Sequence, residues 1–158
     1  MLSSILVPTY RRPHQLAEAL ASLAQQDLAL LGEVLIGDDS LAEFRPANLD
    51  VIAKSGLASL VRYLPNDPPK GSYPNQWALG EQARCEQLLI LHDDDHLCPG
   101  GLAALASARL AETDERVKVW FGRDLILDEK GQVDPQRSSE NARRFGKDGA
   151  GCAKPAWE

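Results

Sequence analysis

Residues 4–23 read SILVPTYRRPHQLAEALASL, and this stretch decides the fold. It begins with a short apolar run that contains β-branched residues and ends at Pro8. A run that is apolar on both faces predicts a buried parallel strand. After Pro13, which fits the first turn of a helix, leucines recur on one helix face, at Leu16, Leu20 and Leu23. The stretch therefore predicts a β-strand followed directly by an α-helix.

The same alternation of strand and helix continues along the chain. Further runs that predict strands lie at residues 33–37, 60–64, 88–91, 117–121 and 125–127, the last closed by a turn at 128–131. Helices are predicted at residues 49–54, at residues 74–84 with Ser72 as a cap, and from Gly101 onward. Strands that alternate with helices indicate an α/β fold, with a mostly parallel sheet, flanking helices and right-handed crossovers.

The length and composition suit one domain with a hydrophobic core. The chain has 158 residues, of which 44% are hydrophobic, and is too short for two full enzyme domains. We expect residues 1–133 to form that domain, with Trp77 and Trp120 packed in its core. Residues 134–158 are polar and glycine-rich. They are expected to form a flexible arm, a loop over the site or a piece of something larger.

The charge balance and the cysteines limit the partners and the compartment. With 17 basic and 23 acidic residues the net charge is −6, the opposite of what nucleic-acid binding needs. No apolar run approaches the length of about 20 residues that spans a bilayer, and the first residues lack the basic region of a secretory signal. Three cysteines, Cys85, Cys98 and Cys152, have no framework spacing. We therefore expect reduced thiols, a cytoplasmic protein and no nucleic-acid partner.

Polar side chains follow three of the apolar runs at the point where each run ends. Thr9 follows the first run, Asp38 and Asp39 follow the second, and three aspartates at residues 93–95 follow the fourth. In an open α/β sheet, ligands bind outside the carboxyl ends of the parallel strands. These polar groups are therefore expected to meet at one edge of the sheet.

Aspartates gathered at one edge repel each other unless a cation or a hydrogen-bonding ligand compensates them. Ligation by carboxylates alone selects a hard cation such as Mg²⁺ or Mn²⁺, which is usually completed by water and substrate phosphates. The pattern therefore favours a site for a nucleotide diphosphate. An Asp pair after a strand is also common as a helix cap or a solvated loop, and this second interpretation stays open.

Three motifs occur in order within residues 3–127. They are Ile5-Leu6-Val7-Pro8-Thr9-Tyr10 with Arg12-Pro13, then Val34-Leu35-Ile36-Gly37-Asp38-Asp39-Ser40, then Leu89-Ile90-Leu91-His92-Asp93-Asp94-Asp95-His96-Leu97-Cys98-Pro99. As an ordered set they resemble the family 2 glycosyltransferases of the GT-A fold. Asn75, which precedes the acidic run, also resembles an asparagine that the family often has there. The resemblance implies a nucleotide-diphospho-sugar transferase fold.

The resemblance also implies a role for residues of the first two motifs. The nucleobase pocket would be lined by the residues that end the first strand, Pro8, Thr9 and Tyr10, with Arg12 near it. Asp39 would accept a hydrogen bond from the base, typically the uracil imide, and Asp38 would support that turn. Lys70 would approach the diphosphate from its loop, or would remain a solvated lysine.

The third motif would hold a divalent metal, Mn²⁺ or Mg²⁺. The common form in the family is Asp-x-Asp-Asp, and here His92 stands in the first position. Asp93 would then face the ribose, and Asp94 would bind the metal, followed by Asp95 as a second candidate ligand. In an alternative register, Asp93 to Asp95 form the Asp-x-Asp motif itself.

The implied function is transfer of a sugar from a nucleotide-diphosphate donor, with a UDP-sugar favoured, to a saccharide, lipid or protein hydroxyl. An inverting member also needs an Asp or Glu base, which the family has downstream of the metal motif. Glu140 and Glu158 are the only glutamates beyond Gly131, and neither lies in such a motif. The catalytic base stays unknown. We therefore expect a donor-binding half, a truncated product, or an enzyme whose acceptor site comes from a protein or peripheral membrane partner.

Other classes of protein share single features of this pattern. His92, His96 and Cys98 have a spacing that suggests zinc, but no fourth ligand is apparent. Asp93 and Asp95 after an apolar strand resemble the motif of haloacid dehalogenase phosphatases. Sugar nucleotidyltransferases share the fold type but open with a glycine-rich phosphate loop. A non-catalytic module that binds a nucleotide sugar is the non-enzymatic alternative.

Overall fold

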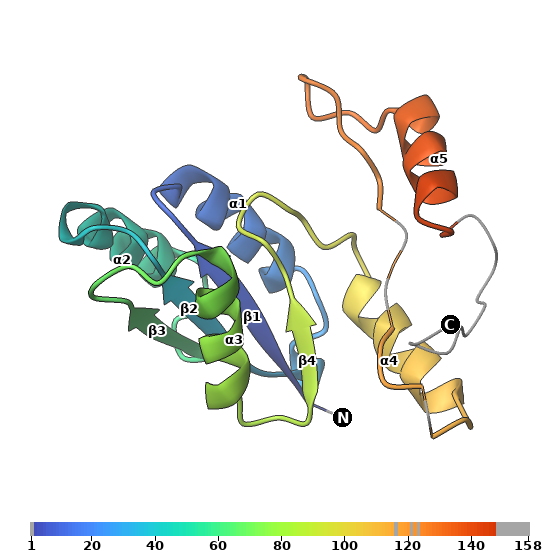
Figure 1. Cartoon of the computed structure of the whole chain (residues 1–158), viewed down its shortest axis with the longest axis horizontal. Helices are drawn as coiled ribbons and strands as arrows, with labels where there is room; N and C mark the ends of the chain where they lie inside the picture. The colour runs from blue at the N-terminus through green and yellow to red at the C-terminus, as the bar shows by residue number, and fades with distance from the viewer. Residues whose placement is uncertain (1, 116, 121, 123, 148–158) are drawn as a thin grey trace. The chain divides into compact units, whose positions relative to one another are not determined.

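The computed structural model describes residues 2–115, 117–120, 122 and 124–147. The expectations for Phe121, Cys152 and Glu158 therefore concern residues outside this description. The chain divides into two compact units, Met1–Ala103 and Ala104–Glu158. The elements follow in the order β1 (Ser3–Thr9), α1 (Pro13–Ala24), the 3₁₀ helix η1 (Leu28–Leu30), β2 (Leu31–Asp38), the 3₁₀ helix η2 (Ala42–Phe44), α2 (Arg45–Lys54), β3 (Val61–Pro65), α3 (Ser72–Gln82), β4 (Gln87–Ile90), α4 (Gly101–Ala111) and α5 (Pro135–Arg144) (Figure 1).

The first unit contains a four-stranded parallel sheet in the order β3-β2-β1-β4. β1 lies inside the sheet and pairs along its whole length with β2, and from Ser3 to Leu6 with β4. β2 also pairs with β3, so that Asp38 lies opposite both Thr9 and Pro65. Since parallel strands run in the same direction, their carboxyl ends share one edge of the sheet. The prediction of an α/β fold with a mostly parallel sheet is confirmed.

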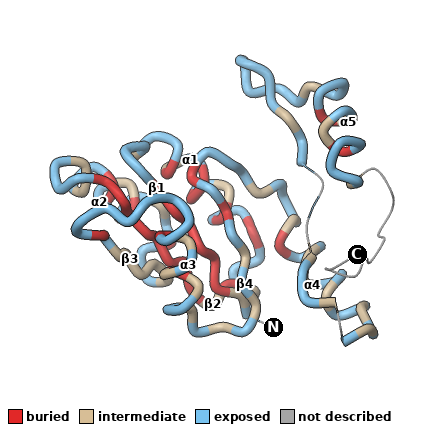
Figure 2. The backbone as a smooth tube through the Cα atoms, in the orientation of Figure 1, coloured by how far each residue is buried: buried red, intermediate tan, exposed pale blue. Residues whose placement is uncertain are grey.

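Different helices cover the two faces of this sheet. On one face the strands pack against α1 and α2, through buried residues that include Ile5, Val7, Val34, Ile36, Leu16, Leu20, Leu23 and Ile52. On the other face, Leu6 and Leu35 pack against Leu79 of α3. Alternate residues of a strand point to opposite faces, so β1 and β2 are buried on both sides (Figure 2). This double burial explains the uninterrupted apolar runs at residues 5–7 of β1 and 34–36 of β2.

The start of α3 and the position of its tryptophan differ from the prediction. Gly71, with a φ of 89°, is the N-cap of α3, and Ser72 is the first helical residue. The prediction that Ser72 caps this helix is therefore wrong. Trp77 is 73% exposed, and its Nε1 donates a hydrogen bond to Glu81. The prediction that Trp77 packs in the core is therefore wrong. Asn75 and Leu79 face the sheet four residues apart, and Trp77 lies midway between them on the opposite side of the helix.

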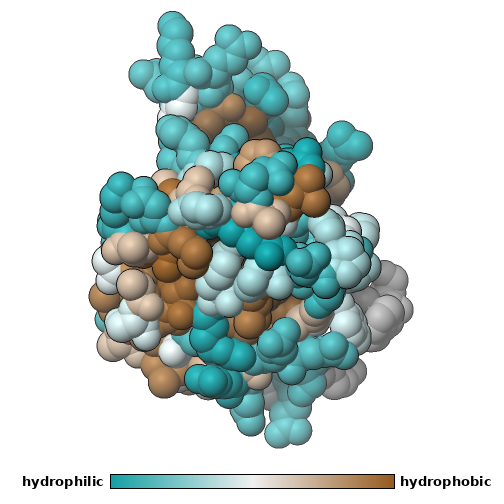
Figure 3. Space-filling model, turned by 90° about the vertical axis from the view of Figure 1, so that its left-hand side faces the viewer, coloured by the Kyte–Doolittle hydropathy of each residue, from teal (hydrophilic) through white to brown (hydrophobic). Residues whose placement is uncertain are grey.

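β4 is an edge strand, and its burial alternates. Leu88 is 50% exposed and Ile90 is 49% exposed, whereas Leu89 is packed against the core. Hydrophobic groups also interrupt the hydrophilic surface on the face drawn in Figure 3, which is normal for a folded protein. Within the described part of the chain, no helix is long and apolar enough to cross a membrane.

The described residues of the second unit form helices and loops instead of the two predicted strands. Residues 117–120 are not part of a strand, and Leu127 forms one antiparallel bridge with Val133. The bridge encloses the predicted turn, in which Gly131 N donates to Asp128 O at 3.0 Å. Two paired segments are marginally stable without a larger sheet or a helix to cover them. The expected polar arm contains the helix α5, whose N-cap Asp134 accepts a hydrogen bond from Arg137 N.

Candidate functional site

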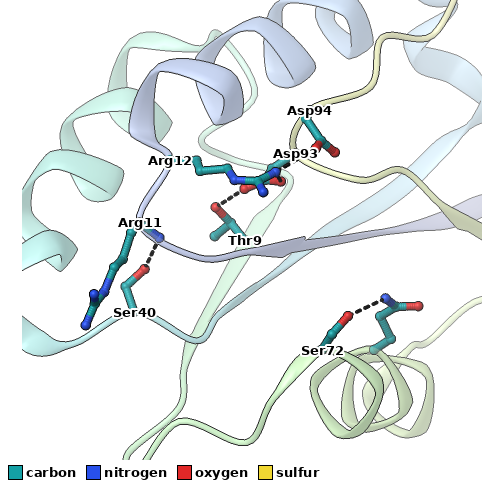
Figure 4. A network of polar contacts seen from close by, with 8 residues as sticks. Thr9, Arg11, Arg12, Ser40, Ser72, Asp93 and Asp94 are labelled. Carbon is teal, nitrogen blue, oxygen red and sulfur yellow. Dashed lines mark hydrogen bonds and ion pairs between the residues drawn. The ribbon is translucent and has the colours of Figure 1, made fainter.

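Three strand ends meet around Thr9 at the carboxyl edge of the sheet. Asp39 N donates to Thr9 O at 3.0 Å, which joins the ends of β1 and β2. Thr9 Oγ1 donates to Asp93 Oδ2 at 2.7 Å, which joins β1 to the loop after β4 (Figure 4). Thr9, Asp39 and Asp93 are 3%, 6% and 5% exposed, respectively. The prediction that polar groups from separate runs meet at one edge is confirmed.

Arg12 forms ion pairs with Asp93 and with Asp94. We call these two aspartates the carboxylate pair. Arg12 Nη1 lies 2.6 Å from Asp94 Oδ2 and 3.4 Å from Asp93 Oδ1. The hydrogen bond to Asp94 and the two negative charges raise the pKa of Arg12 above its ordinary value. The side chains of Arg12 and Asp94 are about half exposed, at 46% and 54%, whereas the Asp93 side chain is buried. The pair is therefore open to solvent on the side of Asp94.

Asp38 is an internal support of the site. It is fully buried and accepts hydrogen bonds from Ser40 N at 2.8 Å, Asn48 Nδ2 at 2.7 Å and Tyr63 Oη at 2.5 Å. Burial alone would raise the pKa of Asp38, but the hydrogen bonds from Ser40, Tyr63 and Asn48 outweigh it and hold that pKa below its ordinary value. Burial and the neighbouring Asp38 raise the pKa of Tyr63. Asp38 therefore fixes the end of β2 from inside the protein.

Asp39 holds the loop at residues 66–71 against the end of β2. Its Oδ1 accepts from Lys70 N at 2.6 Å and Asn66 Nδ2 at 3.0 Å, and its Oδ2 accepts from Gly71 N at 2.7 Å. Lys70 thus contacts Asp39 through its backbone, and the residue is exposed. Both oxygens of Asp39 act as acceptors for this loop, which gives the loop a defined position beside the carboxyl edge.

Asn66 and Gly37 belong to the site although sequence reasoning did not single them out. Asn66 Nδ2 also donates to Asn75 Oδ1 at 2.9 Å, and Asn75 Nδ2 donates to Gly37 O at 2.9 Å. A Cβ at residue 37 would lie 2.4 Å from Asn75 Oδ1, so only glycine admits this approach. An asparagine directly after Pro65 and a glycine directly before Asp38 could have drawn attention to these two positions. Neither residue type, however, indicates from the sequence that its partner is Asn75.

The chain leaves β1 through a strained turn at Tyr10 and Arg11. Arg11 has a φ of 56°, in the left-handed region that non-glycine residues rarely adopt, and its N donates to Ser40 Oγ at 2.7 Å. Its guanidinium lies 4.9 Å from the ring centre of Tyr10 and 5.2 Å from that of Phe44. Tyr10 is 48% exposed, and Pro8 is buried inside β1. Strained backbone of this kind concentrates at functional sites.

The carboxylate pair is a partial site for a cation. In the described part of the chain, no three His, Cys, Asp or Glu side chains are grouped to hold a metal ion. The three residues whose spacing suggests zinc, His92, His96 and Cys98, are therefore not assembled into a metal site. His96 Nε2 instead lies 3.7 Å from Glu18 Oε2. The pair nevertheless places two carboxylate oxygens around one cationic nitrogen, that of Arg12. This donor set fits Mg²⁺ or Mn²⁺ when substrate phosphates and water supply the remaining ligands.

Together these features define a parallel α/β protein with a polar ligand site at the carboxyl ends of its strands. The chain belongs to the family described as Glycosyl transferase family 2, whose model matches residues 4–155. No curated protein matches the chain closely enough to count as a relative.

Solved structures of TarS from S. aureus are similar to this chain. The crystal structure of TarS 1–349 matches with a TM-score of 0.59 and 26% identity, covering 68% of this chain and 32% of that one. Its complex with UDP gives the same four values. The complex with UDP-GlcNAc has a TM-score of 0.59 and 24% identity, covering 68% of this chain and 31% of that one. The fold is of the GT-A type, and the chain spans about a third of the TarS chains that it matches.

Proposed function

We propose that this chain binds a nucleotide-diphosphate sugar at the carboxyl ends of β1, β2 and β4, and serves transfer of the sugar to an acceptor hydroxyl. The observation that carries the proposal is the convergence of Thr9, Asp39 and Asp93 at one edge, joined through Thr9. Membership of a glycosyltransferase family supports this function. The crystal structure of TarS with UDP favours a UDP-sugar as the donor.

We assign the nucleoside to the edge between β1 and β2. Tyr10 offers an exposed ring there, beside buried Pro8 and Thr9. Asp39 shapes the opposite side by holding the loop at residues 66–71, and the exposed Lys70 side chain of that loop is assigned to the diphosphate. Asp38 keeps the turn in place from behind. The protein thus forms a fixed frame for the base before the sugar donor binds.

We assign the ribose and the diphosphate to the loop after β4. Asp94 would hold a divalent ion, Mn²⁺ or Mg²⁺, together with Asp95 or, in the alternative register, with Asp93. Asp93, which Thr9 orients, is also the residue nearest the ribose in this assignment. When the bond between the anomeric carbon and the diphosphate breaks, negative charge develops on the leaving phosphate. The divalent ion supplies positive charge at that phosphate when it is bound. In the structure, the cation that pairs with Asp93 and Asp94 is the guanidinium of Arg12.

A non-catalytic module that binds a nucleotide sugar is the second candidate. The observation behind this candidate is that no general base is identified among the described residues. Glu140 accepts a hydrogen bond from Gln136 on the surface of α5, and Glu158 lies outside the described residues.

We propose a cytoplasmic location and an acceptor that is a saccharide, lipid or protein. If the chain is instead an enzyme with a divided site, a protein or peripheral membrane partner supplies the acceptor site.

Isothermal titration calorimetry with UDP, in the presence and absence of Mn²⁺, tests the proposal. The wild-type chain should bind UDP with Mn²⁺, and Asp94→Asn should weaken that binding about tenfold or more because a metal ligand is lost. Asp50→Asn removes a carboxylate that pairs with Lys54 on α2 and should bind UDP like the wild type. Binding of UDP that ignores both Mn²⁺ and Asp94→Asn would contradict the proposal. Hydrolysis or transfer assays with UDP-sugars then separate an enzyme from a binding module.

A further inference from the structure

We propose that Arg12 is a built-in counter-cation that competes with the divalent ion for the carboxylate pair, so that metal binding depends on the sugar donor. This inference rests on the proposed function, because it concerns the same donor site. It adds a property that neither the family match nor the TarS structures assign, namely weak binding of the metal alone.

Arg12 occupies the point at which the two carboxylates converge. One nitrogen, Nη1, contacts Asp94 Oδ2 at 2.6 Å and Asp93 Oδ1 at 3.4 Å. Asp93 is held in place by Thr9 Oγ1, which donates to its other oxygen at 2.7 Å. Figure 4 shows the guanidinium directed at Asp93 and Asp94 above Thr9. A hard cation that uses these oxygens must therefore take the position of the Arg12 nitrogen.

The Arg12 side chain is free to leave while its backbone stays fixed. Arg12 is the N-cap of α1, and its carbonyl accepts a hydrogen bond from Leu16 N at 2.9 Å. The side chain is 46% exposed and that of Asp94 is 54% exposed. Ion pairs with this exposure contribute little to stability, because water and salt screen them. Exchange of the ion pair therefore does not require the helix or the sheet to move.

Exchange of this ion pair links the metal to the diphosphate. An ion that binds alone must displace the guanidinium into water, and the displaced charge gains no new partner. A diphosphate offers the guanidinium phosphate oxygens that match its planar set of N–H groups. Metal and sugar donor should then each strengthen binding of the other by the same factor, as linkage requires. Arg12 thus favours binding of the metal together with the donor over binding of the metal alone.

Electron paramagnetic resonance of free Mn²⁺ measures the affinity of the full chain for the metal without nucleotide. Arg12→Gln removes the competing charge and should bind Mn²⁺ about two- to fivefold more tightly than the wild type, the range set by a half-exposed ion pair. Arg12→Ala provides the same test through a second substitution. Arg12→Lys keeps the positive charge and should remain near the wild type. Lys54→Gln, on the exposed face of α2, controls for the change in net charge.

Adding UDP completes the test. UDP should raise the affinity for Mn²⁺ by a larger factor in the wild type than in Arg12→Gln. Equal or weaker Mn²⁺ binding by Arg12→Gln and Arg12→Ala, with circular dichroism spectra like that of the wild type, would overturn the role of Arg12. Failure of the wild type to bind UDP and Mn²⁺ together would instead refute the proposed function, so the two failures are distinguishable.

Discussion

Replacing Glu33 by glutamine should destabilise the first unit while leaving the site intact. Glu33 lies near the start of β2, opposite Ser4 in β1, whereas the site lies at the other end of both strands. It is 4% exposed and accepts hydrogen bonds from Ser4 Oγ at 2.7 Å, Arg84 N at 2.6 Å and Arg62 Nη1 at 2.8 Å. One carboxylate therefore connects both strands to β3 and to the segment before β4.

The size of the effect follows from these contacts. Glutamine keeps one carbonyl oxygen, which still accepts from Ser4 and Arg84, but its amide group faces the Arg62 guanidinium with N–H donors. The charged hydrogen bond at Oε2 is lost, which costs about 1.5–3 kcal/mol. Arg62 still donates to Gln82 O and its side chain is 27% exposed, so its charge is not stranded in the core. We therefore expect a total loss of about 2–3 kcal/mol, below the cost of breaking a fully buried pair.

The same contacts predict how this loss depends on pH. Burial raises the pKa of Glu33, but the hydrogen bonds from Arg62, Ser4 and Arg84 outweigh it and hold that pKa below its ordinary value of 4.5. A carboxyl group with a lowered folded-state pKa stabilises the fold fully above its unfolded pKa. That stabilisation is lost as the pH falls through the folded-state pKa. The difference between wild type and Glu33→Gln should therefore be largest near neutral pH and shrink at pH values below 4.5.

Urea unfolding followed by circular dichroism, at neutral and at acidic pH, measures both quantities. Glu18→Gln is the matched control, because Glu18 is half exposed and lies 3.7–3.8 Å from two histidines; it should change the free energy of unfolding by less than about 0.5 kcal/mol. A loss below about 1 kcal/mol for Glu33→Gln at neutral pH would refute the assigned network, since a charged hydrogen bond contributes more. So would a difference that grows as the pH falls.

Two further substitutions test the frame of the site. Gly37→Ala would place a Cβ 2.4 Å from Asn75 Oδ1, so urea unfolding should show a loss of about 1–3 kcal/mol; Gly80→Ala, where an added Cβ meets nothing within 4 Å, should show none. Asp39→Asn replaces one acceptor of the Lys70 and Gly71 N–H groups by a donor, so the loop at residues 66–71 should open more often. Trypsin should then cut after Lys70 faster than in the wild type, and an unchanged rate would show that Asp39 does not hold the loop.

The fold and the location of the site could be predicted because they depend on local patterns. Doubly buried strands require continuous apolar runs, and residues 5–7 and 34–36, inside the predicted strands, are of this kind. Leucines on one face of α1 likewise follow from burial against the sheet. Once the strands are parallel, residues that follow them must lie at one edge, which places Thr9, Asp39 and Asp93 without coordinates.

The hydrogen-bond partners inside the site could not be predicted in this way. Asn66, Asn75 and Gly37 meet only because the loop after β3 folds back over the end of β2. The sequence does not indicate that these residues hydrogen-bond to each other, because a side-chain amide can bond to a residue at any distance along the chain. The strands predicted at residues 117–121 and 125–127 fail for the opposite reason. Apolar content alone does not form a strand, and among the described residues the pairing of these two runs is limited to the bridge between Leu127 and Val133.

The aspartates after β2 and after β4 look alike in sequence, but the structure uses them differently. Asp38 and Asp39 accept hydrogen bonds from backbone N–H groups and from neutral side chains, and these bonds last as long as the fold does. Asp94 instead pairs with the half-exposed Arg12, an ion pair that water and salt screen. The proposed nucleotide site thus combines both kinds of contact. The fixed hydrogen bonds hold the backbone at the carboxyl edge, whereas breaking the exposed ion pair of Arg12 with Asp94 leaves that backbone in place.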